Sequence, residues 1–172
     1  MIRLLGALCI LVSCSSYGFL RGQLWTDRLK QIRIIRRIFI TLSGDIGYGS
    51  ISLPESLERI AGQVDMPFSR FLKNISGEMR RGQGKPLDII FREEIDRTLG
   101  YSALKPSDKA GLAQMGALLG SMDRGTQVQI INMYLQELDT TIADITDSIG
   151  SRQKLCRMLG VVSGILIIIL LL

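Results

Sequence analysis

The sequence has no histidine and only three cysteines, none of which lies in the middle of the chain. Cys9 and Cys14 belong to an apolar N-terminal stretch, and Cys156 adjoins an apolar C-terminal one. A zinc or haem site needs histidine or grouped cysteine ligands, so neither is expected here. The same distribution indicates no disulfide framework in the central part of the chain.

Motifs for catalysis and for phosphate binding are also scarce. Glu93, Glu94 and Asp96 are close in sequence, but adjacent helical positions diverge by about 100°, so we interpret them as a solvated acidic face. Two glycine-rich segments, 44–49 and 80–86, do not complete a phosphate-binding loop. The first has no Lys-Ser/Thr after it, and the second has a proline where the Ser or Thr belongs. We therefore expect no enzyme activity and no cofactor.

Positive charge is concentrated beside the two apolar ends of the chain. There are 21 Lys and Arg residues against 16 Asp and Glu, a net charge of +5, yet the segment 38–147 is net acidic. This distribution is typical of the cytoplasmic flanks of membrane spans, and nucleic acid is not expected as a partner. The basic residues that we assign to the juxtamembrane flanks are Arg33, Arg36, Arg37, Arg152, Lys154 and Arg157.

The N-terminal stretch, residues 1–20, predicts a transmembrane helix. Residues 4–20 carry no charge, and 17 residues is near the lower limit for crossing a bilayer. A second interpretation stays open, because the sequence LVSC at 11–14 resembles a lipobox in which Cys14 would be acylated. A cleaved signal peptide is less consistent with the sequence, since the region offers no A-x-A site.

The C-terminal stretch, residues 155–172, predicts a second transmembrane helix with Arg157 as its one charged residue. Gly160 and Gly164 form a G-x-x-x-G pattern that would let another membrane helix pack closely. No proline interrupts residues 126–172, so one long helix could include both a soluble part and the span. The basic flanks place the central segment, 21–154, in the cytoplasm and both termini outside.

The central segment predicts two long amphipathic helices that pack antiparallel. In 24–43, apolar residues recur every seven positions, and in 126–149 they recur at spacings of three and four. Four shorter helices are expected between them, within 54–64, 67–79, 87–99 and 108–119, the last capped by Ser107. Glycines at 44–49 should end the first long helix, and Gly116 and Gly120 should bring another helix close. The predicted fold is all-α: an antiparallel six-helix cytoplasmic bundle carried on N- and C-terminal transmembrane helices.

Several short segments, taken in order, resemble the stage III sporulation protein AB family of endospore-forming bacteria. That family is similar to the inner-membrane platform protein of type II secretion and type IV pilus machines. The segments are MIRLLG at 1–6, RLKQIR at 28–33, DIGYG at 45–49, LPESL at 53–57, GALLG at 116–120 with Asp123, Arg124 and Gln127, and KLCRMLG at 154–160.

The resemblance implies a membrane platform subunit of a secretion-like transenvelope complex that links mother cell and forespore. The implied location is the mother-cell membrane, and the implied partners are a cytoplasmic secretion-type ATPase, other membrane subunits of the sporulation channel and membrane lipid. Platform proteins usually carry two copies of the bundle, so this chain, with one, is a candidate homo-oligomer. Asp45 stands where we would expect a glutamate.

Three turns are the candidate contact surfaces for these partners. The residues concerned are Asp45, Tyr48 and Gly49 in the first turn, Arg80, Arg81 and Lys85 in the second, and Asp123, Arg124 and Gln127 in the third. Two other functions remain as alternatives: an acylated lipoprotein, and a scaffold that binds anionic lipid through its juxtamembrane basic residues.

Overall fold

The computed structural model describes residues 2–48, 51–82, 84–121 and 123–171, and it places side chains only between residues 25 and 149. All regular structure in these ranges is helical. The six helices are α1 (Ile2–Tyr48), α2 (Leu53–Ala61), α3 (Phe68–Arg81), α4 (Leu87–Leu99), α5 (Pro106–Ser121) and α6 (Arg124–Leu171). The all-α prediction with six helices is confirmed for this part of the chain.

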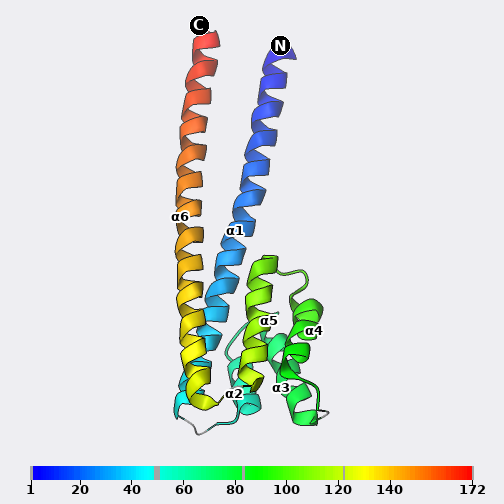
Figure 1. Cartoon of the computed structure of the whole chain (residues 1–172). Coiled ribbons are helices and arrows are strands. Elements are labelled where there is room, and N and C mark those ends of the chain that lie inside the picture. The colour runs from blue at the N-terminus through cyan, green and yellow to red at the C-terminus, as the bar shows by residue number, and fades with distance from the viewer. Residues whose placement is uncertain (1, 49–50, 83, 122, 172) are drawn as a thin grey trace.

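The two long helices, α1 and α6, run antiparallel and side by side, so that both chain ends lie at the same end of the molecule (Figure 1). The apolar seams predicted for them are buried between them and the shorter helices, as Ile32 and Ile131 illustrate. The rings of Phe39 and Tyr134 meet edge to face with their centroids 5.0 Å apart. The predicted antiparallel pairing of these helices is therefore confirmed.

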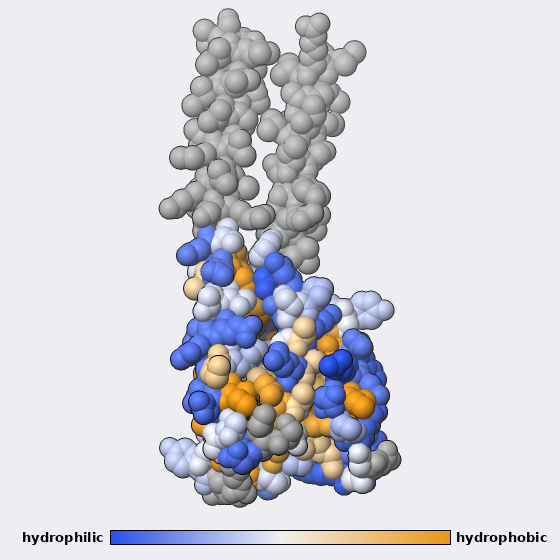
Figure 2. Space-filling view, in the orientation of Figure 1, coloured by the Kyte–Doolittle hydropathy of each residue, from blue (hydrophilic) through white to orange (hydrophobic). Residues whose placement is uncertain are grey.

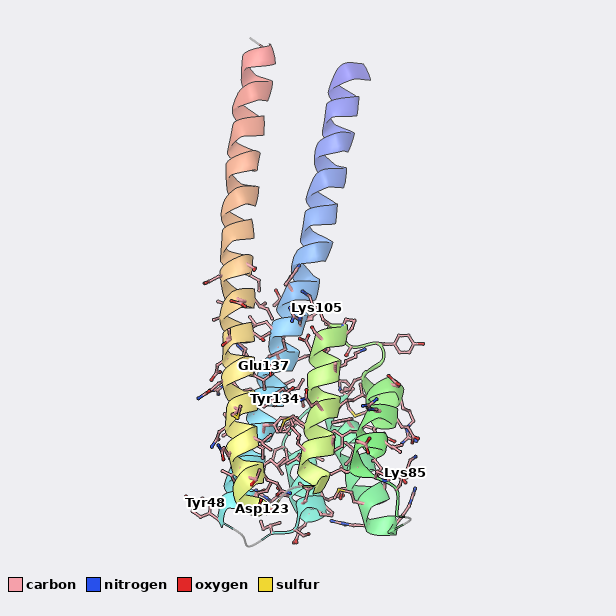
Figure 3. The ribbon with its side chains drawn as sticks, in the orientation of Figure 1. Tyr48, Lys85, Lys105, Asp123, Tyr134 and Glu137 are labelled. Atoms are coloured by element: carbon pink, nitrogen blue, oxygen red, sulfur yellow. The ribbon has the colours of Figure 1, made fainter. Side chains whose placement is uncertain are left out.

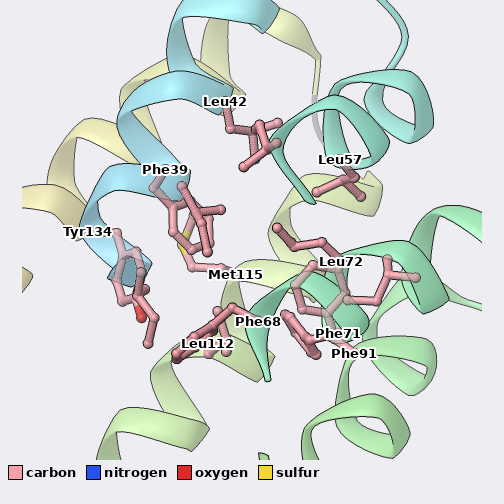
Figure 4. Packing of buried hydrophobic residues seen from close by; sticks show 14 of the residues in the cluster. Phe39, Leu42, Leu57, Phe68, Phe71, Leu72, Phe91, Leu112, Met115 and Tyr134 are labelled. Carbon is pink, nitrogen blue, oxygen red and sulfur yellow. The ribbon is translucent and has the colours of Figure 1, made fainter. Parts of the chain in front are cut away.

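The four short helices form a lobe against the lower half of this pair (Figure 1). In sequence order each packs on the next, and α2 also contacts α1. The core of the lobe is aromatic, with Phe71 and Phe91 at 5.7 Å and nearly perpendicular. Figure 4 shows how residues from the long pair and from the lobe share one core: Phe39, Leu42, Leu57, Phe68, Phe71, Leu72, Phe91, Leu112, Met115 and Tyr134.

Close contact between α4 and α5 depends on two glycines one helical turn apart. A Cβ atom at Gly116 would lie 2.3 Å from the Phe91 ring, and one at Gly120 would lie 2.9 Å from Leu87 Cβ. Neither distance leaves room for a side chain, so the two glycines let the helix axes approach. The prediction that this pair brings another helix close is confirmed, and the helix is α4.

The prediction that glycines end the first long helix near residue 44 is wrong, because α1 continues to Tyr48. Each glycine costs a helix about 1 kcal/mol relative to alanine. Packing offsets this cost, since Ile46 is buried and Gly47 lies against Val128, with its would-be Cβ 3.9 Å from Val128 Cγ2. Tertiary contacts thus override local propensity here.

The start of α5 also differs from the prediction. The helix begins at Pro106, a favoured first position for proline, so Ser107 lies inside the first turn and does not cap it. Asp108 instead reaches back and accepts a 2.8 Å hydrogen bond from the Lys105 backbone N–H. In a capping box, the side chain of the third helical residue accepts a hydrogen bond from the backbone N–H of the N-cap residue, and Asp108 and Lys105 form this bond.

Glu94 is not part of a solvated acidic face, as the sequence suggested, because its side chain is buried. Its carboxylate accepts a 2.8 Å hydrogen bond from the amide nitrogen of Asn74 and forms a 2.8 Å ion pair with Arg97. These partners compensate for the loss of water around a buried charge. Glu93 and Asp96 are exposed, as expected.

Across the residues that the structure describes, no helix combines the length and the hydropathy needed to cross a membrane. The two predicted spans, 1–20 and 155–172, fall where α1 and α6 continue as helix but where no side chain is described. The same holds for Gly160 and Gly164. Both spans, and the packing role of these glycines, stay predictions.

Candidate docking surface

The candidate contact turns gather at one end of the bundle. In Figure 3, Tyr48 and Asp123 lie at the end farthest from the two chain termini, and Lys85 lies on the lower part of the lobe. The chain reaches this end three times, at the end of α1, between α3 and α4, and between α5 and α6. The fold thereby brings together segments that are far apart in sequence.

Asp45 connects α1 to α2. Its carboxylate accepts hydrogen bonds from the hydroxyl of Ser56, which is buried, and from the guanidinium of Arg59. Burial alone would raise the pKa of Asp45, but the bonds from Arg59 and Ser56 outweigh it and hold the pKa below its usual value. The Asp45 carboxylate is therefore engaged within the chain.

Tyr48, the last residue of α1, is 90% exposed. An aromatic side chain with its polar hydroxyl is a frequent anchor in protein interfaces. Gly49, which we also singled out, lies outside the described residues.

Two of the basic residues around the loop between α3 and α4 form local ion pairs. The guanidinium of Arg81 contacts Glu78, and the ammonium of Lys85 contacts Glu93, while Arg80 is exposed. Gly82 ends α3 with φ of 63°, in the left-handed region that favours glycine. This conformation ends the helix and turns the chain towards α4.

Asp123 caps α6. Its carboxylate accepts hydrogen bonds from the backbone N–H of Gly125 at 3.1 Å and of Thr126 at 3.3 Å, and from the Thr126 hydroxyl at 2.6 Å. The Thr126 hydroxyl and then the Thr126 N–H hold the pKa of Asp123 below its usual value. Gln127 donates from Nε2 to the Leu119 carbonyl at 2.8 Å, which fastens α6 to α5. The side chain of Arg124 lies outside the described ones.

An open groove of about 580 Å³ joins two of the three candidate turns. Its polar rim includes Glu78, Lys85 and Gln127, and its wall includes the backbone at Gly82 and Gly120. The apolar residues of the groove have the same helical spacing as buried core residues. The sequence alone therefore could not have located the groove. These apolar residues are Leu53, Met79, Leu87, Ile90 and Leu119.

The surface around the candidate turns has both polar and apolar parts. Among the described residues, no group of three or more His, Cys, Asp or Glu side chains could hold a metal ion. The face seen in Figure 2 is largely hydrophilic, with separate apolar patches over the lower half of the bundle. Apolar patches framed by polar residues are typical of protein interaction surfaces.

The three basic residues on α1 that we assigned to the juxtamembrane flank differ in their surroundings. Arg36 is bound within the chain, to Asp139 of α6, by hydrogen bonds of 2.5 and 3.2 Å, whereas Arg33 and Arg37 are exposed. At a rise of about 1.5 Å per residue, Arg36 lies about 24 Å along α1 from the predicted end of the span at residue 20. Screening at physiological salt acts over about 8 Å, so a charge at this distance from the membrane surface would interact with it only weakly. The lipid-scaffold alternative itself stays a prediction. Arg152, Lys154 and Arg157 lie outside the described side chains.

Comparisons with known proteins agree on one family. The family model described as "Stage III sporulation protein AB" matches residues 3–172. Stage III sporulation protein AB of Bacillus subtilis (strain 168) is 30% identical over 171 residues, which cover 99% of both chains. A solved structure of stage III sporulation protein AB (SpoIIIAB) superposes with a TM-score of 0.66 at 27% identity, covering 72% of this chain and 97% of that one.

Proposed function

Because this chain belongs to the stage III sporulation protein AB family, it is a sporulation protein, and we propose that it acts as a non-enzymatic platform subunit in the mother-cell membrane. In this role it holds a helical bundle in the cytoplasm, as part of a secretion-like complex that links mother cell and forespore. Its cytoplasmic partner is a secretion-type ATPase, and other membrane subunits of the channel surround its two membrane helices.

The polarity of the molecule is the observation that supports this role best. The N-terminal part of α1 and the C-terminal part of α6, which include the predicted spans, lie at one end of the fold. The three candidate contact turns lie towards the opposite end (Figures 1 and 3). A platform needs this arrangement, because a partner that approaches from the cytoplasm first meets the end away from the membrane.

The groove between α3, α4 and α5 is the proposed docking point. An apolar floor inside a charged rim is what a partner needs to bury an anchor side chain while rim charges orient it. The long pair then connects that point rigidly to the membrane. The α1 and α6 helices have no break described between the bundle and the predicted spans, and Arg36 and Asp139 tie them to each other on the way.

A co-purification experiment tests the proposal. The full-length chain, tagged and expressed in sporulating cells, is solubilised from the membrane and its partners are identified by mass spectrometry. We expect the wild type to recover a secretion-type ATPase and the variant Arg80→Glu/Lys85→Glu to lose it. This variant reverses the charge of Lys85 on the groove rim and of Arg80 beside it. The matched control is Arg70→Glu/Lys73→Glu, which makes the same charge change on exposed residues of α3 away from the groove.

The outcomes separate the two parts of the proposal. If the wild type recovers no such ATPase, the platform role is wrong. If the ATPase stays with the groove variant as strongly as with the control, the role stands but docking is elsewhere.

A further inference from the structure

The outer face of α1 carries a basic stripe, which consists of Lys30, Arg33, Arg37 and Ile40. The spacings of three, four and three residues place these side chains on one helix face. All four are exposed, and Ile40, at 43% exposure, is an apolar residue that the fold leaves unburied. The stripe points away from the seam that buries Ile32 and its neighbours.

The outer face of α6 carries a complementary acidic stripe, which consists of Met133, Glu137, Asp144 and Asp147. Their spacings also follow a single helix face, with Thr140 filling the position between Glu137 and Asp144. All are exposed, and Met133, at 63% exposure, is the apolar residue of this stripe.

Within the described part of the chain, the charges of the two stripes are almost entirely unused. The only ion pair that involves them joins Lys30 to Asp27 at 3.8 Å, between two well-exposed side chains. Arg36 and Asp139, which lie beside the stripes and not in them, form the ion pair that connects α1 to α6 within one chain. The stripes therefore do not serve the pairing of the two helices inside the molecule.

The register of α1 against α6 puts matching residues at the same height along the bundle. Phe39 contacts Tyr134, and Arg36 binds Asp139. In both pairs the two residue numbers add up to about 174. An α1 residue and an α6 residue whose numbers add up to about this value therefore lie at the same height along the bundle. By this rule Ile40 is level with Met133, Arg37 with Glu137, and Lys30 with Asp144. At each of these heights the stripes offer an apolar pair or an opposite-charge pair.

We propose that the basic stripe of one copy packs against the acidic stripe of a second copy of this chain. The two copies stand in the same membrane, a condition that rests on the proposed function, so their helices share one height and α1 of one copy runs antiparallel to α6 of the next. Ile40 then contacts Met133, and Arg37 and Lys30 face Glu137 and Asp144. Each copy uses two different surfaces, so the contact is heterologous and repeats around a ring or along a row.

A second copy fits these surfaces better than an unrelated partner does. One chain contains both the basic stripe and the acidic stripe. The two stripes have opposite charge, and each has one apolar residue at the same height. Exposed ion pairs are individually weak. Copies confined to one membrane with a common orientation, however, meet at a high effective concentration, which makes a set of weak contacts sufficient.

Disulfide trapping tests the contact. In a full-length background with Cys9, Cys14 and Cys156 changed to serine, Ile40→Cys and Met133→Cys are combined and the protein is oxidised in phospholipid vesicles. We expect a ladder of disulfide-linked dimers and higher multimers. Either substitution alone should stay monomeric, because a heterologous contact does not bring two copies of the same residue together. Lys30→Cys with Met133→Cys is the control for height, since these positions differ by about 15 Å along the helices.

Charge reversal gives a second, independent test. Arg37→Glu in one sample and Glu137→Arg in another should each lower cross-linking in the 40/133 background about tenfold. Mixing the two variants should restore it, because the glutamate introduced at position 37 of one copy then faces the arginine introduced at position 137 of the other. Cross-linking by the single-cysteine proteins, equal cross-linking by the height control, or no rescue on mixing would each overturn the proposal.

The test also distinguishes this proposal from the proposed function. Flotation of the vesicles reports whether the chain is anchored in the membrane, and recovery of the ATPase reports docking at the groove. A protein that floats and binds the ATPase but forms no 40–133 disulfide overturns only the self-association.

Discussion

The guanidinium of Arg28 in α1 donates two hydrogen bonds, each of 2.8 Å, to the carboxylate of Asp108 in the first turn of α5. Both side chains are 10% exposed, so this is a buried bidentate ion pair between residues eighty positions apart. Nearby, the ammonium of Lys105 lies 4.7 Å from the centroid of the Trp25 ring. Together these contacts fasten the upper edge of the lobe to the long helix pair.

Removing one partner of this pair should cost far more than removing both. Arg28→Ala leaves the Asp108 carboxylate buried without its cation, and we expect a loss of about 3 kcal/mol in the free energy of unfolding. The double variant Arg28→Met/Asp108→Leu replaces the pair by apolar groups and should lose about 1 kcal/mol or less. Denaturant unfolding of the full chain in detergent, followed by circular dichroism, measures both. Equal losses for the two variants would show that the ion pair is not the dominant contact.

Acid should weaken the connections that α1 makes to α2 and α5. Burial raises the pKa of Asp108, but the hydrogen bonds from Arg28 and from the Lys105 N–H outweigh it and lower the pKa, as at Asp45. A carboxyl whose folded pKa is depressed contributes stability above its unfolded pKa of about 4, and that stability is lost as pH falls further through the folded pKa. The melting temperature should therefore drop below about pH 4, and less steeply in Arg28→Met/Asp108→Leu. Parallel curves for both proteins would contradict the assignment.

Two glycine-to-alanine substitutions should act in opposite directions. At Gly116 the new methyl would overlap the Phe91 ring, so Gly116→Ala should destabilise the bundle by about 2 kcal/mol. At Gly44 no atom lies within 4 Å of the added Cβ, so Gly44→Ala should stabilise α1 by about 0.5–1 kcal/mol. Thermal unfolding of the two variants beside the wild type measures both. A destabilising Gly44→Ala would mean that the end of α1 needs the glycine for another reason.

The cap of α6 can be separated from a role in partner binding. Asp123→Ala removes the oxygens that accept from Gly125 and Thr126 and should cost about 1 kcal/mol. Asp123→Asn keeps a capping oxygen and should cost only a few tenths of a kcal/mol. If the charge of Asp123 contacts the ATPase, Asp123→Asn lowers ATPase recovery while the melting temperature hardly moves. Unchanged recovery with Asp123→Asn would limit this residue to capping.

Helix order and helix faces could be predicted from the sequence because both depend on local pattern. The seams of 24–43 and 126–149 repeat at helical spacing, and the burial of Ile32 and Ile131 follows from that spacing. The G-x-x-x-G pair at Gly116 and Gly120 likewise indicated a close helix contact without saying which helix would supply it. Such features need only residue type and position along one element.

Polar residues were harder to place, because their environment is set by groups far away in sequence. Asp45 resembled a contact residue, but Ser56 and Arg59 of α2 bind its carboxylate. The sequence predicted that Glu94 is solvated, but in the structure its carboxylate accepts a hydrogen bond from Asn74 of α3. A carboxylate has the same local sequence signal whether water or a distant amide hydrogen-bonds to it, so only the tertiary structure distinguishes the two.

The sequence by itself determined that this chain is helical, that two long seams pair, and that its segments match one sporulation family. Periodicity, capping residues and short family segments hold that information, and all of them are local. The tertiary structure alone decided that α1 continues through its glycines, that Arg28 binds Asp108, and that two turns share a groove. It also set the register of α1 against α6, and with it the heights of the two charged stripes, because packing between distant elements determines which side chains are level with one another.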